Sequence, residues 1–337
     1  MIRKILSIGV NLFAVYTAFT FLGIPVTAKE PLRVAQKQAS SEPSKFELRW
    51  GTITVGGAWQ VVGSAMLEDI KRVNPRITGS IAPSTTTANV IAVHQGKFNI
   101  GFSLSDTTAD AWDGVGYFKS YGKMDDIRNL MTIYPQTTHI VVQADSKILK
   151  IEDLKGKRIS PGAKGLSNDL ETQRLFKLYG FSYNDTKVSF LSFEDAALQF
   201  TDGHLDALMF LTVTHPYAPI INVSSKSNIR MISIPDDKVA ELCKFRGVEP
   251  YTMPPGVYRG VDYPVKGIAV RSHIIVRKDM PDDVAYTIVK TISENFKRYS
   301  TVYKAMEQVK DKDMARDVGI PFHPGALKYY REKNLIK

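Results

Sequence analysis

The sequence contains a single cysteine, Cys243, among its 337 residues. One thiol cannot form a disulfide within the chain, so the fold cannot depend on internal cross-links. Its neighbours are Leu242 and Lys244, and a lone cysteine in such a context is more typical of a packed side chain than of a nucleophile. The fold must therefore be held together by its hydrophobic core.

Several motifs that carry catalysis or nucleotide binding are also missing. The chain has neither the Gly, four residues, Gly-Lys-Ser/Thr loop nor a G-x-G-x-x-G fingerprint, and it lacks H-E-x-x-H and G-x-S-x-G. The six histidines include no i, i+4 pair and no carboxylate cluster at metal-ligand spacing. We therefore expect no enzyme activity, no catalytic residues, no cofactor and no metal site.

The charge pattern also excludes one class of partner. The chain has 44 basic and 34 acidic side chains, a formal net charge of +10, and these charges are spread along its length. Because no basic stripe interleaves with aromatic residues, we expect no nucleic-acid partner. A basic exported protein is suited to anionic ligands or to proximity to a membrane surface.

The N-terminus reads as an export signal. Arg3 and Lys4 precede an apolar run from Ile5 to Val26, and small residues follow, ending at Ala28. This pattern predicts a signal peptide over residues 1–28, cleavage after Ala28 and a periplasmic location. The run is long enough that an uncleaved membrane anchor is the alternative. Residues 29–45 have no apolar period and are expected to form a linker.

An internal repeat is the most informative pattern in the remaining chain. The stretch GKFNIGFSLS begins at Gly96, and a similar stretch, GHLDALMFLT, begins at Gly203. In each copy a helical pattern ends at a glycine suited to a helix C-cap, and an apolar run typical of a buried strand follows. The same offset nearly superposes the glycine loop at Gly57 on the loop at Gly162 and Gly165.

Each half therefore predicts a strand, a glycine loop, a helix, a strand, a hydroxyl-rich turn, a helix and a strand. Alternating strands and helices are typical of parallel sheets, so we expect an α/β protein with two lobes of like topology. The predicted crossing segments are 139–143 and 268–276. They assign residues 46–139 and 270–337 to one lobe and residues 140–269 to the other, with a ligand cleft between the lobes.

Ligands of such sheets bind beyond the carboxyl ends of the strands, where the glycine loops and hydroxyl-rich turns of this chain fall. Glycine lets a ligand approach the backbone, and a helix that starts there presents free amides to an anion. The candidate ligand-binding residues are Gly56, Gly57, Trp59, Gln60, Ser84, Thr85, Thr86, Ser105, Asp106, Gly162, Lys164, Gly165, Ser167, Asn168, Thr214 and His215.

Some of these residues also have purely structural interpretations. Lys164 and the adjacent amides are predicted to hold a carboxylate, although Lys164 could equally be a surface residue in a turn. Asn168 and Glu171 are predicted to form a capping pair for the helix that follows. Asp106 faces the cleft or caps its own helix. His323 precedes a proline suited to a first helical turn, which favours a structural role.

A family resemblance rests on short motifs that follow one another in order. They are Gly56-Gly57, the hydroxyl-rich turn that ends at Asn89, GKFNIGF from Gly96 with Ser105-Asp106, DLKGKRI over 153–159, DGHLDA over 202–207, PPGVY over 254–258 and HPGALKYY over 323–330. From about Arg49 to Arg331 the chain resembles the TAXI family, the solute-binding subunits of TRAP transporters.

The resemblance implies a two-lobed periplasmic-binding-protein fold that closes on a small organic anion, such as an amino acid or a dicarboxylate. It also implies TRAP-type membrane subunits as partners, which receive the ligand. A sensing protein that feeds a separate signalling partner is the alternative. Trp59, Leu104 and Leu166 depart from the family pattern, and they predict a bulkier or more apolar anion than glutamate, held between Trp59 and the Lys164 loop.

Overall fold

The computed structural model describes residues 45–53 and 57–337. The predicted signal segment, its cleavage site, almost all of the predicted linker and Gly56 lie outside the described residues. None of the helices in the described part of the chain is both long and apolar enough to cross a membrane. Residues 43–337 form one compact unit.

Ten strands form the framework of this unit. They are β1 (Phe46–Gly51), β2 (Ile77–Ala82), β3 (Ile100–Leu104), β4 (Ile127–Gln143), β5 (Arg158–Ser160), β6 (Lys187–Val188), β7 (Ala207–Val213), β8 (Ile229–Met231), β9 (Val248–Met253) and β10 (Val265–Arg277).

The helices lie between these strands and after the last one. They are α1 (Ala58–Val73), α2 (Thr86–His94), α3 (Ser105–Asp113), α4 (Ser167–Leu178), α5 (Phe193–Thr201), α6 (Ala218–Lys226), α7 (Asp236–Leu242), α8 (Asp282–Glu294), α9 (Phe296–Val302), α10 (Asp311–Met314) and α11 (Pro324–Glu332). Short 3-10 helices span Gly116–Ser120, Ile151–Leu154, Tyr183–Asp185 and Lys304–Gln308.

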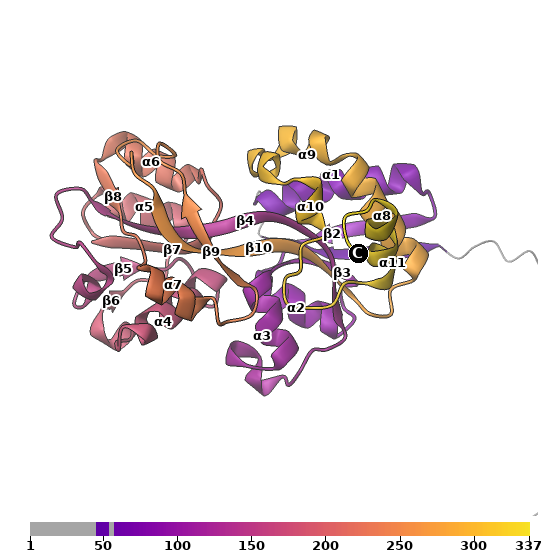
Figure 1. The fold of residues 1–337 in the computed structure, drawn as a ribbon, viewed down its shortest axis with the longest axis horizontal. Coiled ribbons are helices and arrows are strands. Elements are labelled where there is room, and N and C mark those ends of the chain that lie inside the picture. The colour runs from indigo at the N-terminus through magenta and orange to yellow at the C-terminus, as the bar shows by residue number, and fades with distance from the viewer. Residues whose placement is uncertain (1–44, 54–56) are drawn as a thin grey trace, which may run out of the picture. The chain divides into compact units, whose positions relative to one another are not determined.

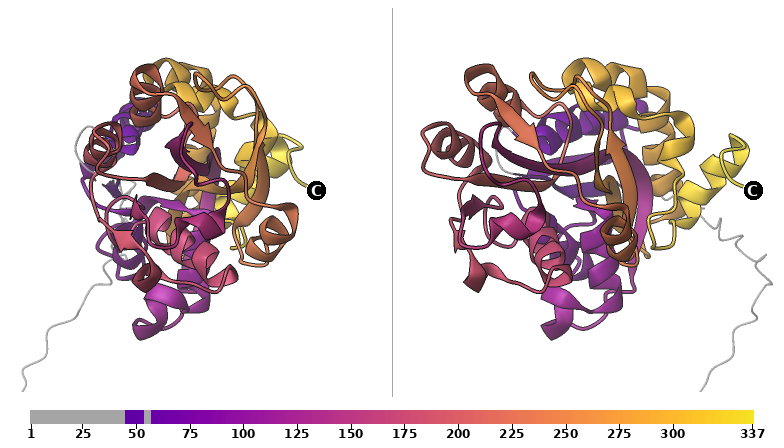
Figure 2. Two further views of the ribbon diagram at one scale, coloured as in Figure 1. Left: turned by 90° about the vertical axis from the view of Figure 1, so that its left-hand side faces the viewer. Right: turned by 60° about the vertical axis from the view of Figure 1, so that its left-hand side comes forward.

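The strands form one mixed sheet in the order β2-β1-β3-β10-β4-β7-β5-β6, with β8 beside β4 and β9 beside β10. Pairs among β1, β2 and β3 and among β5, β6 and β7 are parallel. All pairs that involve β4 or β10 are antiparallel. Figures 1 and 2 show helices on both faces of this sheet. The predicted alternation of strands and helices is confirmed.

The two longest strands, β4 and β10, join the two parallel groups. Residues 127–137 of β4 pair with β10, and residues 137–142 pair with β7. The predicted crossing segments fall within these strands, but both strands begin earlier than predicted, at Ile127 and Val265. Figure 1 shows β4 and β10 running between the two groups of helices.

We call β1 to β3, α1 to α3 and α8 to α11 the first lobe. We call β5 to β9 and α4 to α7 the second lobe. We propose that these groups correspond to the predicted lobes, with the boundaries at residues 139/140 and 269/270 lying inside β4 and β10.

The predicted repeat is confirmed by the element bounds. The offset from Gly96 to Gly203 also carries both ends of α2 onto the ends of α5, and it carries the start of β3 onto the start of β7. Gly96 and Gly203 follow α2 and α5 with φ values of 71° and 76°. No atom lies within 4 Å of a Cβ added at either position, so the left-handed backbone alone explains the glycines.

The hydrophobic core is continuous through both lobes. One cluster of buried residues includes Trp50 and Phe102 in the first lobe and Phe176 and Leu211 in the second. Cys243 is half-buried against this cluster, and burial raises the pKa of its thiol. A thiol in this state is mostly protonated, which agrees with the predicted packing role rather than with a nucleophile.

The C-terminal helix is fastened to the middle of the sheet. The Tyr330 hydroxyl donates to the Leu130 carbonyl of β4 at 2.9 Å, and His323 N donates to the Asn129 carbonyl at 2.9 Å. The buried His323 side chain caps α11 by accepting a hydrogen bond from Gly325 N. The structural interpretation of His323 is therefore confirmed.

Candidate functional site

A cavity of about 390 Å³ lies where elements of both lobes meet, and we call it the interlobe cavity. Its lining residues are Ile53, Gly57, Ala58, Trp59, Thr85, Thr86, Leu104, Tyr134, Gln136, Ala163, Leu166, Ser167, Asn168, Ser192, Phe193, Glu194, Thr212, Val213, Thr214, Tyr217 and Tyr303. The volume is within the range of small-molecule sites.

The N-terminal ends of six helices surround this cavity. The N-cap residues of α1 to α6 all line it, and they are Gly57, Thr85, Leu104, Leu166, Ser192 and Tyr217. The first amides of a helix have no partner within the helix, and the helix dipole places partial positive charge at that end. The cavity is therefore surrounded by backbone groups that favour a negative ligand.

Side chains cap two of these helix ends. In α2 the Thr85 hydroxyl accepts from Ala88 N, and in α5 the Ser192 hydroxyl accepts from Asp195 N. The N-cap residues of α1, α3, α4 and α6 provide no such hydrogen bond within the described part of the chain, and that of α1 is a glycine without a side chain.

Of the four uncapped ends, α1 and α4 contribute the most residues to the cavity lining. The first two helical residues line it in both cases, Ala58 and Trp59 in α1 and Ser167 and Asn168 in α4. Helices α3 and α6 contribute only their N-cap residues to the lining. Helix α1 belongs to the first lobe and α4 to the second, so a ligand bound at both ends would connect the lobes.

Aromatic rings form much of the cavity wall. Trp59, Tyr134, Phe193, Tyr217 and Tyr303 line it. The Trp59 ring is 5 % exposed and stacks on a core phenylalanine of β3 at 5.5 Å with an interplanar angle of 16°. The Tyr134 and Tyr303 rings lie 5.5 Å apart. Much of the wall is therefore aromatic ring surface, interrupted by tyrosine hydroxyls, and the Trp59, Tyr134 and Tyr303 rings pack against other rings of the protein.

Formal charge is scarce around the cavity. Among the described residues that line the cavity, Glu194 is the one residue of the Asp, Glu, His, Lys and Arg types. The Glu194 side chain is exposed. Residues 45–53 and 57–337 contain no group of three or more His, Cys, Asp or Glu side chains that could hold a metal ion. The cavity thus offers an anion backbone amides and hydroxyls rather than a cationic side chain.

Thr212 is a lining residue whose buried hydroxyl has unsatisfied hydrogen-bonding capacity. The residue is 2 % exposed, and its hydroxyl has no hydrogen-bond partner among the described residues. Its backbone is fully engaged, because Thr212 N donates to the Asn168 side-chain carbonyl at 2.8 Å and its own carbonyl accepts from the Asn168 amide at 3.3 Å. Asn168 thus fixes β7 against the start of α4.

This pairing overturns the predicted capping role of Asn168. The N-cap of α4 is Leu166, and Asn168 lies inside the helix. Glu171, its predicted partner, instead accepts a hydrogen bond from Arg174. The side chain of Asn168 reaches the neighbouring strand because a paired backbone donor and acceptor are available there, which a local sequence pattern does not reveal.

The cavity brings together seven of the predicted ligand residues: Gly57, Trp59, Thr85, Thr86, Ser167, Asn168 and Thr214. Eight others do not line it: Gln60, Ser84, Ser105, Asp106, Gly162, Lys164, Gly165 and His215. Gly56 lies outside the described residues. The two glycine loops and the hydroxyl-rich turn therefore contribute to one cavity, although only part of each faces it.

Ser105 and Asp106 connect elements. The Ser105 hydroxyl donates to the Gly247 carbonyl and accepts from Arg271 N at 2.8 Å. Asp106 accepts from the Ser167 hydroxyl at 2.6 Å and does not cap α3, whose N-cap is Leu104. The alternative that Asp106 caps its own helix is therefore wrong.

Lys164 and His215 also make contacts away from the cavity lining. The Lys164 ammonium lies 5.8 Å from the centre of the Phe190 ring, and the residue is exposed. His215 Nε2 lies 2.6 Å from the Tyr251 hydroxyl, and burial lowers the pKa of His215. The predicted role of Lys164 as a cationic ligand partner has no support in this geometry.

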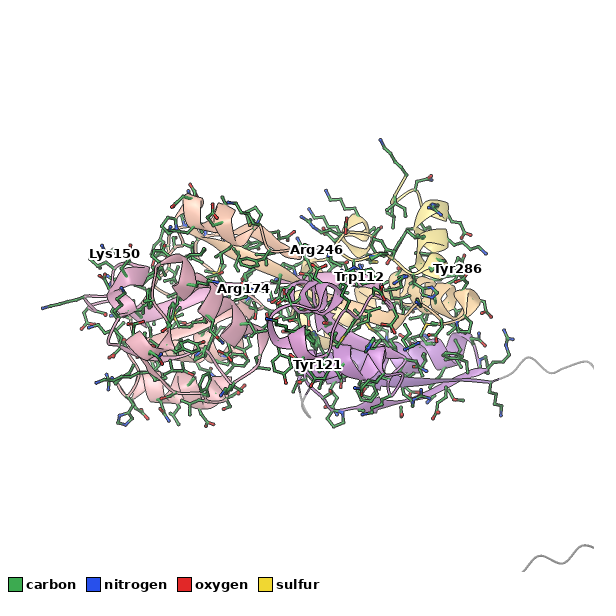
Figure 3. The ribbon with its side chains drawn as sticks, turned by 90° about the horizontal axis from the view of Figure 1, so that it is seen from below. Trp112, Tyr121, Lys150, Arg174, Arg246 and Tyr286 are labelled. Atoms are coloured by element: carbon green, nitrogen blue, oxygen red, sulfur yellow. The ribbon has the colours of Figure 1, made fainter. Side chains whose placement is uncertain are left out.

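A buried group of charged side chains joins α3 of the first lobe to α4 of the second. This α3/α4 cluster consists of Asp106, Asp110, Ser167, Glu171 and Arg174. The Arg174 guanidinium binds both Asp110 and Glu171, and the Ser167 hydroxyl donates to Asp106. Figure 3 labels Arg174.

Burial controls protonation in the α3/α4 cluster. It raises the pKa of Glu171 to about 8, an effect that Arg174 opposes and that Asp106 and Asp110 reinforce. Burial likewise raises the pKa of Asp110 to about 6. The Glu171 Oε2 atom has no partner among the described residues, which fits a carboxyl that retains its proton near neutral pH.

Other groups surround this cluster. Burial, Glu249 and, to a smaller extent, Glu171 raise the pKa of the Cys243 thiol, which lies just after α7. The Arg174 guanidinium lies 4.5 Å from the centre of the Phe245 ring. Arg246, labelled in Figure 3, binds Asp113 of α3 at 2.5 Å. The segment after α7 therefore adds a further contact between the lobes.

Several lining residues were not predicted from the sequence, namely Tyr134, Gln136, Ser192, Phe193, Glu194, Thr212, Tyr217 and Tyr303. The repeat carried a signal for two of them, because its offset carries Thr85 and Thr86 onto Ser192 and Phe193. Tyr134 and Tyr303 come from a strand interior and from the segment after α9, where no local motif marks a ligand contact.

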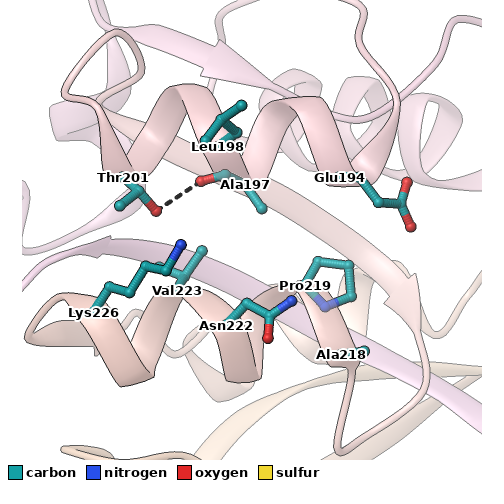
Figure 4. Close-up of a pocket in the computed structure, with 9 residues that line it drawn as sticks. All are labelled: Glu194, Ala197, Leu198, Thr201, Ala218, Pro219, Asn222, Val223 and Lys226. Carbon is teal, nitrogen blue, oxygen red and sulfur yellow. Dashed lines mark hydrogen bonds between the residues drawn. The ribbon is translucent and has the colours of Figure 1, made fainter.

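A second, smaller hollow lies between α5 and α6. It has a volume of about 230 Å³ and includes Ala197, Pro219 and Val223, as Figure 4 shows. Glu194 and Lys226 lie at its two ends. None of its lining residues except Glu194 also lines the interlobe cavity.

The sequence matches the NMT1-like family over residues 50–333. The chain belongs to this family. The match covers β2 to β10 and all the helices that surround the interlobe cavity.

Solved structures of solute-binding proteins are similar to this NMT1-like chain. A TctC solute-binding protein from Polaromonas has 15% sequence identity and a TM-score of 0.50, covering 86% of this chain and 98% of its own. A structure described for glutathione import through GshT and the cystine importer TcyBC of Streptococcus mutans has 13% identity and a TM-score of 0.50, covering 80% and 100%. The alkanesulfonate-binding protein SsuA from Xanthomonas axonopodis pv. citri, bound to MOPS, has 15% identity and a TM-score of 0.48, covering 86% and 84%.

At these identities the similarity concerns the fold. It confirms the predicted two-lobed α/β fold of periplasmic binding proteins for this NMT1-like chain.

Proposed function

We propose that the protein is an extracytoplasmic solute receptor that binds a small organic anion in the interlobe cavity. The observation that carries this proposal is the arrangement of six helix N-caps around one cavity. Amides at such ends stabilise negative charge without a cationic side chain. The family membership and the fold of solute-binding proteins support the same function.

Binding is proposed to work by closure of the lobes. A ligand that contacts the α1 and α4 ends bridges both lobes, so it binds the closed arrangement more tightly than an open one. The strands β4 and β10 run between the lobes and are the segments that would bend. The ligand is released unchanged, so the protein is not an enzyme.

The partner is proposed to be the membrane subunits of a TRAP-type transporter. This assignment rests on the TAXI-family resemblance of the ordered motifs, above all HPGALKYY over 323–330. It places the mature protein in the periplasm, with residues 1–28 acting as the export signal. Affinity of the loaded receptor for purified TRAP membrane subunits would test this partner separately from ligand binding.

Native mass spectrometry of protein purified without denaturation tests the ligand. We expect a retained small acid, which should be recovered chemically unchanged after prolonged incubation with fresh protein. Fluorescence of Trp59, a cavity residue, should respond when that acid is added back to ligand-free protein. Retention of a cation or a neutral sugar with no acid would contradict the proposal, and a chemically altered acid would indicate an enzyme.

A further inference from the structure

Resting on the proposed function, we infer that the ligand is a monovalent organic acid with an aromatic or similarly apolar body. Its single anionic group lies at the N-terminal ends of α1 and α4, and the Thr212 hydroxyl is one of its polar contacts. The inference rests on three separate features of the interlobe cavity: its charge, its walls and one unsatisfied hydroxyl.

The charge of the cavity argues against a second anionic group. Among the described lining residues no lysine, arginine or histidine side chain is present, and Glu194 is the one carboxylate. The first anionic group of a ligand can use the amides of α1 and α4. A second group, held away from the first by the ligand's own carbon chain, would find only neutral partners, because the remaining lining offers hydroxyls, one amide and helix ends of which two are already capped by side chains. No cation would offset the desolvation of this second charge, and such burial is strongly unfavourable.

The walls favour an apolar body. Five aromatic side chains line the cavity, and Leu104 and Leu166 stand at two of the helix ends. Trp59 is fixed by stacking on Phe102, which stacks in turn on Trp50 at 5.3 Å. A ring held in this way loses little conformational freedom when a ligand packs against it. Aromatic ligand surface would gain both burial and ring contacts there.

The unsatisfied hydroxyl of Thr212 indicates a polar contact on the second-lobe side. Buried hydroxyls nearly always have a hydrogen-bond partner. The Asn168 side chain, which lies beside Thr212, is already hydrogen-bonded to the backbone of Thr212. A polar atom of the bound acid would complete the hydrogen bonding of this hydroxyl, because Thr212 lines the same cavity as the α4 N-terminus.

Isothermal titration of ligand-free protein with five probes tests the ligand class. The probes are benzoate, phenylacetate, succinate, glutamate and benzamide. We expect at least one aromatic monocarboxylate to bind on the order of 10-fold or more tightly than succinate or glutamate, a difference that ring burial readily supplies. Benzamide, which has the same ring without the charge, should bind on the order of 10-fold or more weakly than benzoate.

The outcomes separate this inference from the proposed function. Tighter binding of succinate or glutamate than of both aromatic acids would overturn the inference and leave an anion receptor. Equal binding of benzamide and benzoate would show that charge is not recognised, which contradicts both. Failure of all four acids to bind at millimolar concentration would also contradict both.

Two threonines provide a matched test of the hydroxyl contact. Thr212→Val removes the buried, unpartnered hydroxyl of a cavity-lining residue, and Thr291→Val removes another buried, unpartnered hydroxyl in α8. We expect Thr212→Val to weaken binding of the best acid by about 5- to 10-fold or more, because hydrogen bonds to charged groups are strong. Thr291→Val should leave affinity unchanged.

Thr212→Ser serves as the conservative variant, since it keeps the hydroxyl, and it should bind within about threefold of wild type. The melting temperature of ligand-free Thr212→Val should not fall by more than that of Thr291→Val, because no protein hydrogen bond is lost in either. Equal affinity of Thr212→Val and wild type, or equal losses in both valine variants, would overturn the role of Thr212.

Discussion

Trp59 is positioned by the protein before any ligand is present. Its ring continues a stack that begins with Trp50 and Phe102, and all three side chains are buried. The first lobe therefore contributes a ring held in place by packing to the cavity lining. Preorganisation of this kind improves affinity by lowering the entropy lost on binding.

At the residue scale, Lys164 provides a prediction that depends on side-chain placement. Lys164→Ala is expected to leave the affinity for a bound acid within about twofold of wild type, because exposed charges outside a site contribute little. Isothermal titration of the two proteins measures this directly. Lys155→Ala is a matched control, since the Lys155 ammonium also lies over a ring, 5.2 Å from the centre of Phe181.

A loss of about 10-fold or more in Lys164→Ala alone would contradict the placement seen here. Such a loss would mean that the loop carrying Lys164 turns toward the ligand on binding and would restore the role predicted from the sequence.

At the scale of elements, α3 and α4 meet through buried charges rather than through apolar side chains. In the α3/α4 cluster the Arg174 guanidinium binds the Asp110 and Glu171 carboxyl groups, and a third carboxyl group, that of Asp106, accepts from the Ser167 hydroxyl. The free energy of this contact therefore depends on whether its carboxyl groups are protonated. The raised pKa values of Glu171 and Asp110 mean that the folded protein holds these protons more tightly than the unfolded chain does.

Ionisation of Glu171 lowers the stability of the folded protein as the pH rises. The contribution of Glu171 to stability is fully present below the ordinary glutamate pKa of 4.5 and is lost as the pH rises through about 8. The side chain in Glu171→Gln stays neutral at every pH, so this variant does not lose stability through ionisation at this position. Between roughly pH 5 and pH 8, the free energy of unfolding of wild type is expected to fall relative to Glu171→Gln by about 1 to 3 kcal/mol.

Denaturant melts at several pH values measure this difference. Glu241→Gln is the matched control, because Glu241 is an exposed helical residue that pairs with Lys244. Its stability should follow the wild-type pH profile. Parallel profiles for wild type and Glu171→Gln would show that the Glu171 carboxyl is ionised throughout this range, contrary to the effect of burial.

At the scale of the described unit, the largest of three buried clusters spans both lobes. The same buried cluster contains Trp50 of β1 and Leu211 of β7, and β4 pairs with strands of both lobes. We expect residues 43–337 to unfold in a single calorimetric transition, because neither lobe can lose its packing without exposing the other. Two resolved transitions in differential scanning calorimetry would contradict a shared core.

Much of this fold could be predicted from local patterns in the sequence. The repeat was visible because each copy ends at a glycine that must adopt positive φ, Gly96 and Gly203. The full length of β4 was not visible in the sequence, because nearly all its residues are buried and so show no alternation of apolar and polar side chains that would mark its start. Tyr134 and Tyr303 reach the cavity only through long-range packing, and no local pattern encodes that.

The fastening of α11 to β4 has a consequence for how the chain matures. His323 and Tyr330, which donate hydrogen bonds to β4, lie late in the sequence. Helix α8 packs against both α1 and α11. A growing polypeptide therefore completes the second lobe's segment long before the first lobe can bury its apolar surface. The apolar surface of residues 46–139 therefore stays incompletely buried until α8 and α11 have been synthesised.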